Sequence, residues 1–390
     1  MKDDEGPEIL AYLHSFDPGG VERTALRLCA AWQADGARVK VLMGRGTGVT
    51  RTSAPQLDYI VYPSGFLRTA PFETLWMIHC LWKRVRAVRP DVIFCAGNSY
   101  TVVAVALRLL LGRSCPPIVA KVSNALDRRD MPRLGRPFYR LWLRIQARLI
   151  ARWVAIAPGL DGEIAELMRV PRRQISIIAD PAISATEAAA LAASRAGTRD
   201  AAEGRLFLAV GRLARQKRFD LLIDAFARGA GPADRLAIVG EGPQRRRLEA
   251  RAARRGIADR VMLPGHRGDL VPWFAHADAL VMSSDYEGLP AVLVEALAAG
   301  LPVISTRSSP GVATLLEDGL GRLVAPGDVA ALAAAIATDL PAQQAEAAQG
   351  RAAAFRIERA GPAWLDLLRR AARPAAGHVR QSRSEAVSEG

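Results

Sequence analysis

The chain has 390 residues, half of them hydrophobic, so it is long enough to fill the cores of two domains. Its formal net charge is +14, but only five of its 53 basic residues are lysine. Such an arginine excess can reflect genome composition. Charge alone is therefore weak evidence for an acidic partner. Residues 1–7 lack the apolar segment of a signal peptide. The longest apolar run, 101–111, is too short to span a bilayer. We therefore expect a cytoplasmic protein, either free or peripheral on the inner face of the plasma membrane.

The first half of the chain alternates short β-like runs with longer helical patterns. Strands are predicted over residues 8–14, 38–43, 91–95, 118–123, 153–157 and 175–178, and helices over 21–35 and 75–88. This alternation predicts an α/β domain with a parallel sheet covered by helices on both faces. We place this domain at residues 1–185.

A second series begins after a stretch that is poor in large apolar side chains, which we interpret as an interdomain linker over residues 186–204. Strands are predicted over 206–210, 235–239, 261–264, 279–283 and 302–306, and helices over 219–228, 244–255, 270–276 and 290–299. We place the second domain at residues 205–360. The polar residues 374–390 are predicted to be a disordered tail.

Four cysteines occur singly within apolar segments. They are Cys29, Cys80, Cys95 and Cys115. No Cys-x-x-Cys pair occurs, so a zinc or redox site is not expected and buried free thiols are.

The segment Gly211-Arg212-Leu213, with Lys217 behind it, directly follows a predicted strand. Doubly wound domains place their ligand-binding loops at such strand ends. The diphosphate of a sugar nucleotide is anionic and gains charge as its glycosidic bond breaks, which enzymes offset with a metal or with fixed cations. No Asp-x-Asp metal signature occurs, so Arg212 and Lys217 are the cationic candidates, and a solvated basic turn is the alternative.

The segment Glu287-Gly288-Leu289-Pro290 opens a predicted helix that carries Glu295. Pro290 suits the first turn of a helix and Gly288 the tight turn before it. Free backbone N–H groups at such a helix start can bind phosphate or sugar oxygens. Glu287 can face a sugar, and Glu295, alone in an apolar helix, can accept both hydroxyls of a ribose. A Glu295 satisfied by the backbone or exposed on a polar edge is the alternative.

Gly19 and Gly20 connect the first predicted strand to the first predicted helix. Two glycines let the backbone approach a ligand, and the following helix N-terminus favours an anion. The pattern is not the Gly-x-Gly-x-x-Gly of a dinucleotide site, and an ordinary strand-to-helix turn explains it equally well.

Taken together, these segments resemble family 4 glycosyltransferases over roughly residues 8–372. The C-terminal likeness consists of Gly211-Arg212-Leu213 with Lys217, Gly240-Glu241-Gly242-Pro243, Gly265, Glu287-Gly288-Leu289-Pro290 with Glu295, and Gly300-x-Pro302-Val303-Ile304. Gly19-Gly20-Val21-Glu22-Arg23 resembles the family's first loop. The resemblance implies the GT-B fold, in which two Rossmann-like domains face each other across a cleft, and a C-terminal helix, here 361–373, that crosses back to the first domain.

The resemblance also implies retention of anomeric configuration without a metal or other cofactor. It implies that Arg212 and Lys217 hold the diphosphate, that Glu295 binds the ribose, and that Glu287 lies near the donor sugar. Gly211, Pro290 and the backbone N–H groups of Gly288 and Leu289 would complete the donor site. Gly19 and Gly20 would approach the phosphate or the acceptor.

Two positions depart from the family pattern or extend it. Many members carry a histidine after the strand that here ends Lys121-Val122-Ser123, where this chain has Asn124. Asn124 is therefore the candidate that faces the transferred sugar on the acceptor side. His266, after Gly265, lies where the family places its base-binding loop, although a surface histidine is an equal interpretation.

Arginines recur every four residues along one predicted helix. They are Arg136, Arg140, Arg144, Arg148 and Arg152, interleaved with apolar residues that include Trp142 and Trp153. Such a helix could lie on an anionic membrane, or it could be a solvated face.

The expected activity is therefore transfer of a hexose or N-acetylhexosamine from a UDP-sugar, or a GDP-sugar, to a lipid-linked or polysaccharide acceptor in cell-surface glycan biosynthesis. A sugar-nucleotide epimerase of the same fold and a non-catalytic sugar-nucleotide-binding protein are the alternatives. Nucleic acid is not an expected partner, because no recognisable motif or aromatic stacking platform accompanies the positive charge.

Overall fold

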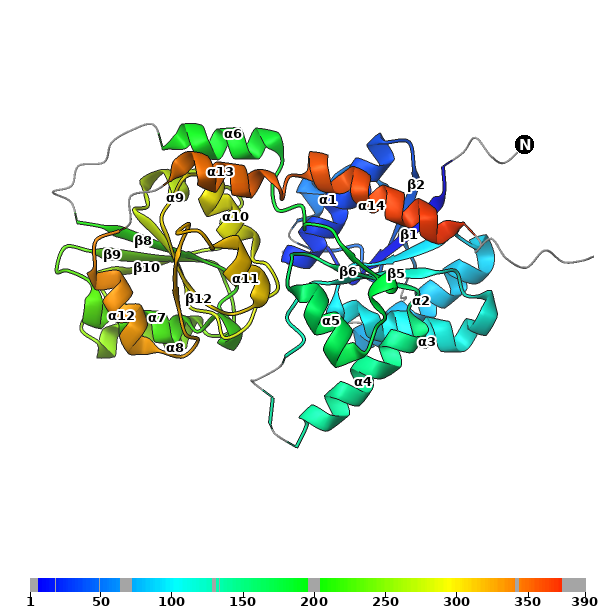
Figure 1. The fold of residues 1–390 in the computed structure, drawn as a ribbon, viewed down its shortest axis with the longest axis horizontal. Coiled ribbons are helices and arrows are strands. Elements are labelled where there is room, and N and C mark those ends of the chain that lie inside the picture. The colour runs from blue at the N-terminus through cyan, green and yellow to red at the C-terminus, as the bar shows by residue number, and fades with distance from the viewer. Residues whose placement is uncertain are drawn as a thin grey trace, which may run out of the picture.

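A computed structural model describes residues 6–17, 19–48, 50–63, 72–127, 131–132, 134–195, 204–340 and 344–373. These residues form two α/β domains that lie side by side, each built on its own parallel sheet (Figure 1). The expected fold class is thus confirmed. The tail predicted over 374–390 lies outside the described residues.

The first sheet has seven strands in the order β3-β2-β1-β4-β5-β6-β7, and every neighbouring pair is parallel. The strands are β1 (Glu8–Leu13), β2 (Arg38–Met43), β3 (Asp58–Val61), β4 (Val92–Cys95), β5 (Ile118–Val122), β6 (Arg152–Ala155) and β7 (Ile175–Ile177). The central strands are nearly continuous hydrophobic runs, as expected when helices cover both faces of a parallel sheet. The short edge strand β3 was not predicted, although Tyr59, Ile60 and Val61 are typical strand residues, and none of its four side chains is fully buried.

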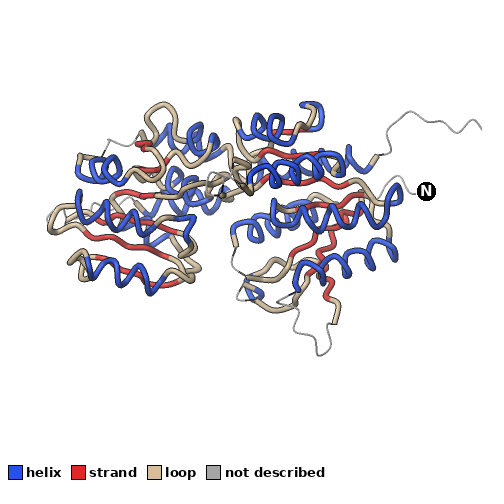
Figure 2. The backbone as a smooth tube through the Cα atoms, turned by 90° about the horizontal axis from the view of Figure 1, so that it is seen from below, coloured by secondary structure: helices blue, strands red, loops and turns tan. Residues whose placement is uncertain are grey.

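Helices surround this sheet on both faces (Figure 2). They are α1 (Gly20–Ala34), α2 (Glu73–Val88), α3 (Thr101–Leu111), α4 (Arg136–Leu149) and α5 (Leu160–Met168). The longest apolar run is α3, and among the described helices none combines the length and the hydropathy needed to cross a bilayer. All four cysteines are buried and free, as predicted.

The second sheet has six strands in the order β10-β9-β8-β11-β12-β13. Its strands are β8 (Leu206–Val210), β9 (Arg235–Val239), β10 (Val261–Gly265), β11 (Ala279–Met282), β12 (Val303–Thr306) and β13 (Arg322–Val324). Its helices are α7 (Phe219–Gly229), α8 (Arg245–Arg254), α9 (Val271–His276), α10 (Ala291–Ala298), α11 (Pro310–Leu315), α12 (Val329–Ala337) and α13 (Ala345–Ala353). In both sheets the strand order reverses once, between β1 and β4 and between β8 and β11, and ligands of doubly wound domains bind at that reversal.

The chain passes between the domains twice, and the two passages run beside each other. The first leads into α6 (Ala185–Ser194), which packs against α9 and α10 of the second domain. The second leads into α14 (Ile357–Ala372). The backbone N–H of Ala182 donates to the Phe355 carbonyl at 3.0 Å, and that of Ile357 donates to the Ile183 carbonyl at 2.9 Å. The predicted linker 186–204 thus contains most of α6, and its remainder 196–203 lies outside the described residues.

Helix α14 returns to the first domain and lies along α1 (Figure 1). It begins at Ile357, four residues before the predicted start. Trp364 is fully buried against Trp32 and Phe94, and the Trp32 indole N–H donates to the Gly361 carbonyl at 3.2 Å. The last helix therefore completes the core of the first domain.

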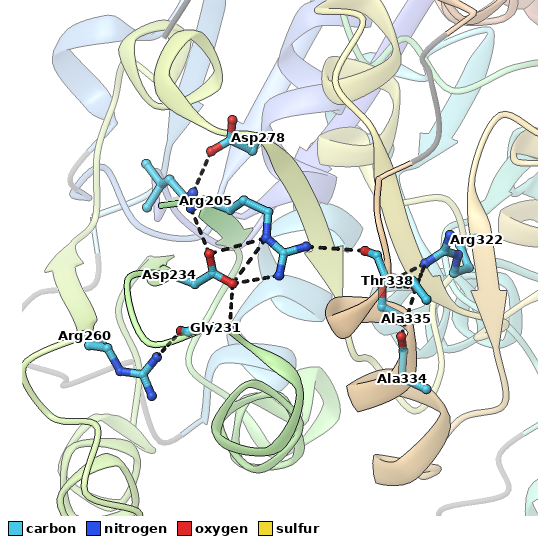
Figure 3. Close-up of polar contacts among 10 residues, drawn as sticks. Arg205, Gly231, Asp234, Arg260, Asp278, Arg322, Ala334, Ala335 and Thr338 are labelled. Atoms are coloured by element: carbon cyan, nitrogen blue, oxygen red, sulfur yellow. Dashed lines mark hydrogen bonds and ion pairs between the residues drawn. The ribbon is translucent and has the colours of Figure 1, made fainter. Parts of the chain in front are cut away.

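A network of polar contacts lies at the amino ends of the strands of the second sheet, whereas the loops at the strand reversal leave the carboxyl ends (Figure 3). Asp234 accepts from the Arg205 backbone at 2.9 Å, from the Arg205 guanidinium at 2.7 Å and from the Gly231 N–H at 2.8 Å. The same guanidinium reaches the Thr338 carbonyl at the end of α12. Burial disfavours the Asp234 carboxylate, but these hydrogen bonds outweigh the burial and hold its pKa below the usual value.

We expect Asp234→Asn to lower the free energy of unfolding of the second domain by about 2 kcal/mol at neutral pH, because it breaks a nearly buried, charge-assisted pair. The folded-state pKa of Asp234 is depressed, so its stabilisation is present above the unfolded pKa and is lost as the pH falls through the folded value. Urea unfolding of both proteins between pH 7 and pH 2 measures this difference. The exposed Asp259→Asn is the matched control, and an equal effect there would attribute the loss to net charge.

Candidate functional site

The carboxyl ends of the two sheets face each other, and the loops that leave them form the candidate site. From the second domain come the loop after β8, with Gly211 and Lys217, and the loop after β11, with Glu287. From the first domain come the start of α1 and the residues around Asn124 after β5. All four segments lie at or beside the strand reversals, where the topology leaves a crevice for a ligand.

Close backbone packing holds the loop after β8. Gly240 has φ +148°, and a Cβ there would lie 2.0 Å from the Gly211 carbonyl oxygen. The Gly211 N–H donates to the Val239 carbonyl at 3.0 Å, which locks the two strand ends together. A glycine is therefore required at position 240, because the backbones of the two loops touch there.

Lys217 and Glu287 form an ion pair with 2.6 Å between Nζ and Oε1. Both side chains are largely buried, at 18% and 8% exposed. The Ser283 hydroxyl donates to the carbonyls of Lys217 and Arg218 at 2.8 and 3.0 Å and so fixes the turn that presents the lysine. The structure thus brings two predicted site residues from separate loops into direct contact.

Glu287 and Gly288 also join the two domains through the backbone. The Ala125 N–H donates to the Glu287 carbonyl at 3.1 Å, and Asn124 forms an isolated antiparallel bridge with Gly288. A Cβ on Gly288 would lie 2.2 Å from the Ser123 carbonyl oxygen. Asn124 and Gly288, both predicted site residues, therefore meet across the domain boundary.

Glu295, on α10, pairs with a residue of the first domain. Its Oε1 lies 3.0 Å from Nη2 of Arg23, with side-chain exposures of 10% and 51%. Neither the backbone nor open solvent satisfies this carboxylate, so both of those alternatives are wrong. Arg23 was noted only as part of a motif, and its role could not be predicted because 272 residues separate the two partners.

A second group missed by the sequence surrounds the end of β1. The Tyr100 hydroxyl donates to Glu22 at 2.6 Å, and the His14 ring stacks on Tyr100 with 4.7 Å between ring centroids. Burial lowers the pKa of His14 and outweighs the carboxylates of Glu73 and Glu22, which raise it. The imidazole is therefore held toward its neutral form, which can accept a proton. The position of His14 at the end of a predicted strand was the available signal.

Gly19 and Gly20 begin α1 at the edge of this group. Gly19 is the N-cap in an extended conformation, and a Cβ there would lie 1.9 Å from Oε2 of Glu22. A Cβ on Gly20 would have no neighbouring atom within 4 Å, so this residue leaves room beside the helix start. The Glu22 side chain thus occupies the space beside Gly19, and contact of either glycine with a ligand stays a prediction.

The remaining candidates are open to solvent. Arg212 is exposed, and its guanidinium makes no hydrogen bond or ion pair with any described residue. His266 is exposed in the loop after β10. Leu289 and Pro290 lead into α10, and Pro290 is its N-cap rather than its first helical residue.

The site thus combines three cations, Arg23, Arg212 and Lys217, with two carboxylates, Glu287 and Glu295. Fixed cations of this kind can stabilise a departing diphosphate, and the carboxylates can accept from sugar hydroxyls. Over the described part of the chain, no three His, Cys, Asp or Glu side chains are grouped as metal ligands would be. Independence from a metal stays a prediction.

Two family models match consecutive parts of this chain. The model described as Glycosyltransferase Family 4 matches residues 18–181, and Glycosyl transferases group 1 matches residues 193–354. These ranges correspond to the two domains, and the matches support a glycosyltransferase of the family 4 type.

Two of the curated relatives are named as glycosyltransferases of lipopolysaccharide. The chain is 34% identical over 184 residues to the lipopolysaccharide core biosynthesis glycosyltransferase LpsE of Rhizobium meliloti, a match that covers 47% of this chain and 52% of LpsE. It is 27% identical over 278 residues to the lipopolysaccharide 1,6-galactosyltransferase of Escherichia coli, with 68% of each chain covered. The chain spans about half, or less, of the length of the first relatives it matches.

Solved structures share the whole fold. Anabaena HepE in complex with UDP and glucose has a TM-score of 0.73 and 19% identity, with 93% of this chain and 99% of HepE covered. The likeness confirms the GT-B architecture of two facing Rossmann-like domains.

We expect Gly288→Ala to push the two domains apart, because the added Cβ would collide with the Ser123 carbonyl. The radius of gyration from small-angle scattering should rise, and the thermal midpoint should fall. Gly350→Ala is the matched control, since that helical glycine has no neighbour within 4 Å of the added atom. If Gly288→Ala and Gly350→Ala behave alike, the domains are not held by this contact.

Proposed function

We propose that the protein is a retaining glycosyltransferase that moves a hexose or N-acetylhexosamine from a nucleotide-diphosphate sugar to a lipid-linked or polysaccharide acceptor. A UDP-sugar is the favoured donor and a GDP-sugar is possible. The observation that carries the proposal is the convergence of Arg212, Lys217, Glu287 and Glu295 at the strand reversal of the second sheet. The glycan-synthesising relatives and the UDP in the HepE structure support it.

The donor would lie across the carboxyl ends of β8 and β11. Glu295 would accept hydrogen bonds from the ribose hydroxyls, exchanging part of its contact with Arg23 for them. Arg212 and Lys217 would bind the diphosphate, and Lys217 would then share its charge between the phosphate and Glu287. Glu287, beside the Gly288 backbone, would orient the donor sugar.

The reaction would be a same-face displacement. The bond between the anomeric carbon and the diphosphate oxygen breaks, the acceptor oxygen bonds to that carbon, and the acceptor proton passes to the departing diphosphate. Arg212 and Lys217 stabilise the charge that grows on the leaving group. No metal takes part in this scheme.

The acceptor would approach from the first domain. Asn124 forms a bridge with Gly288 and would lie next to the transferred sugar. Gly19, Gly20 and the group of His14, Tyr100 and Glu22 would form the neighbouring wall.

We expect Lys217→Ala to lower the rate of transfer from UDP-glucose or UDP-N-acetylglucosamine by about 10²-fold, because it removes one preorganised charge from the transition state. Glu295→Gln should instead weaken UDP binding in a calorimetric titration, because an amide offers only one acceptor oxygen to the ribose. The rate measurement on Lys217→Ala and the titration of Glu295→Gln are both made with EDTA present.

The outcomes separate the competing functions. Turnover of the donor without any acceptor would favour an epimerase, and UDP binding without turnover would favour a non-catalytic binding protein. Loss of transfer in EDTA with recovery in magnesium or manganese would overturn the metal-free scheme.

We also propose that α4 docks the enzyme on the inner face of the plasma membrane. The predicted arginine stripe is only partly exposed: Arg140 and Arg148 are exposed, whereas Arg144 is half-buried. Arg152 and Trp153 lie in β6 rather than on the predicted helix, and Trp153 is 1% exposed and belongs to the core. A sequence pattern cannot tell the covered side of a helix from the open side.

Instead, four exposed apolar side chains lie here, three of them on α4 and one, Leu134, in the turn before it. Leu134, Phe138, Leu141 and Ile145 are 87%, 76%, 56% and 37% exposed. Their spacing places them on one face, and arginines flank the row. An anionic bilayer fits this pattern, because it accepts apolar side chains and attracts the cations beside them.

We expect Phe138→Ser/Leu141→Ser to reduce co-sedimentation with phosphatidylglycerol vesicles, and Arg140→Gln/Arg148→Gln to reduce it most strongly at low salt. Leu75→Ser/Ile177→Ser is the matched control, since these side chains are 66% and 50% exposed on other elements. Equal losses in the control, or equal binding to phosphatidylcholine, would contradict docking through α4.

A further inference from the structure

A groove of about 900 Å³ opens on the second domain, between the start of α7 and the length of α8. Gln216, Asp285 and Tyr286 form one of its walls. These residues directly precede Lys217 and Glu287, and the Gln216 amide donates to the Tyr286 carbonyl at 2.7 Å. The groove therefore adjoins the loops of the candidate donor site, although neither Lys217 nor Glu287 lines it.

Arginines dominate the lining of this groove. They are Arg215, Arg218, Arg246, Arg247, Arg251 and Arg254. The acids that line it are Asp220 and Asp285, and Arg218 pairs with both of them at 3.2 and 3.0 Å. The acids are thus already engaged by one arginine.

The structure separates the arginines of α8 into two sets. Arg245 pairs with Glu241 and Glu249, and Arg251 and Arg255 pair with Asp224. By contrast, the guanidinium groups of Arg246, Arg247, Arg254 and the facing Arg215 make no hydrogen bond or ion pair with any described residue, yet all four line the groove. Other exposed arginines of the described residues also lack a partner, but these four line one hollow.

Gathered like charges repel each other, and an anion bound between them removes that cost. Guanidinium groups bind phosphates and carboxylates through paired hydrogen bonds. On α8, the unpaired Arg247 and Arg254 are seven residues apart, which places them on one helix face, so they can contact successive anionic groups of an extended molecule.

We infer that this groove binds phosphate or carboxylate groups of the acceptor saccharide, so that the acceptor is an acidic glycan. The inference rests on the proposed function. Because the groove adjoins the loops of the candidate donor site, the bound anionic groups would lie beside the reacting end, where the acceptor chain would leave the cleft.

A membrane surface fits this groove less well. The exposed large hydrophobic side chains of the described residues all belong to the first domain, from Val61 to Ile177. The groove is a hollow in the other domain, with no apolar row beside it. It suits an extended polyanion better than a flat lipid surface.

The test is a titration of the full chain with fluorescently labelled hexagalacturonate, mannopentaose phosphate and maltohexaose. We expect both acidic saccharides, or one of them, to bind, and neutral maltohexaose not to. Arg247→Gln/Arg254→Gln should weaken acidic-saccharide binding by about tenfold or more, with a dependence on salt. A clear preference between the two acidic probes would identify the anionic group as carboxylate or phosphate.

The matched control is Arg235→Gln/Arg359→Gln, which removes the same charge from exposed arginines outside the groove. It should bind the acidic saccharides as the wild type does, and all three proteins should bind UDP equally. Absent acidic-saccharide binding with normal UDP binding, or equal weakening in both variants, would overturn the groove assignment alone. Absent UDP binding would overturn the proposed function instead. Selective loss of binding to phosphatidylglycerol vesicles or a short single-stranded oligonucleotide, without loss for the saccharides, would assign the groove to those partners.

Discussion

The contact between Gly288 and the Ser123 carbonyl is the constraint on which the site depends. It is a backbone contact between domains, and a Cβ on Gly288 would lie only 2.2 Å from the carbonyl oxygen. Through it, the carboxyl edges of the two sheets close on each other, so that residues from both strand reversals can meet a single ligand. The paired passages at Ala182 and Phe355, together with α14, hold the same arrangement from the other side of the boundary.

Charge pairing inside this crevice follows from its burial. The carboxylates of Glu287 and Glu295 are each largely shielded from water, and each has a cationic partner, as buried charges require. One pair lies within the second domain and the other spans the cleft. The Lys217–Glu287 pair joins two loops of the second domain, whereas the Arg23–Glu295 pair joins the second domain to the first.

The arginine excess has three different physical roles. Arg205 is part of a buried network that closes the second sheet far from the cleft. Arg140 and Arg148 flank an exposed apolar row on α4. In the groove beside α8, the guanidinium groups of Arg247 and Arg254 have no partner among the described residues. Arginine therefore stabilises the second domain, borders an apolar surface or lines a groove, depending on the residues around it.

The sequence by itself determined the two α/β domains and most of their strands, because buried parallel strands are hydrophobic runs that end at Gly, Pro or Ser. It also indicated Lys217, Glu287 and Glu295 as candidates, because charged residues beside strand ends or in an apolar helix stand out in a sequence. Only the tertiary structure decided the partners of these residues. The pairing of Arg23 with Glu295 spans 272 residues, and the side of α4 that faces solvent depends on packing that local periodicity does not encode. The meeting of Asn124 with Gly288 was likewise decided by the approach of two domains, a long-range contact that neither segment specifies alone.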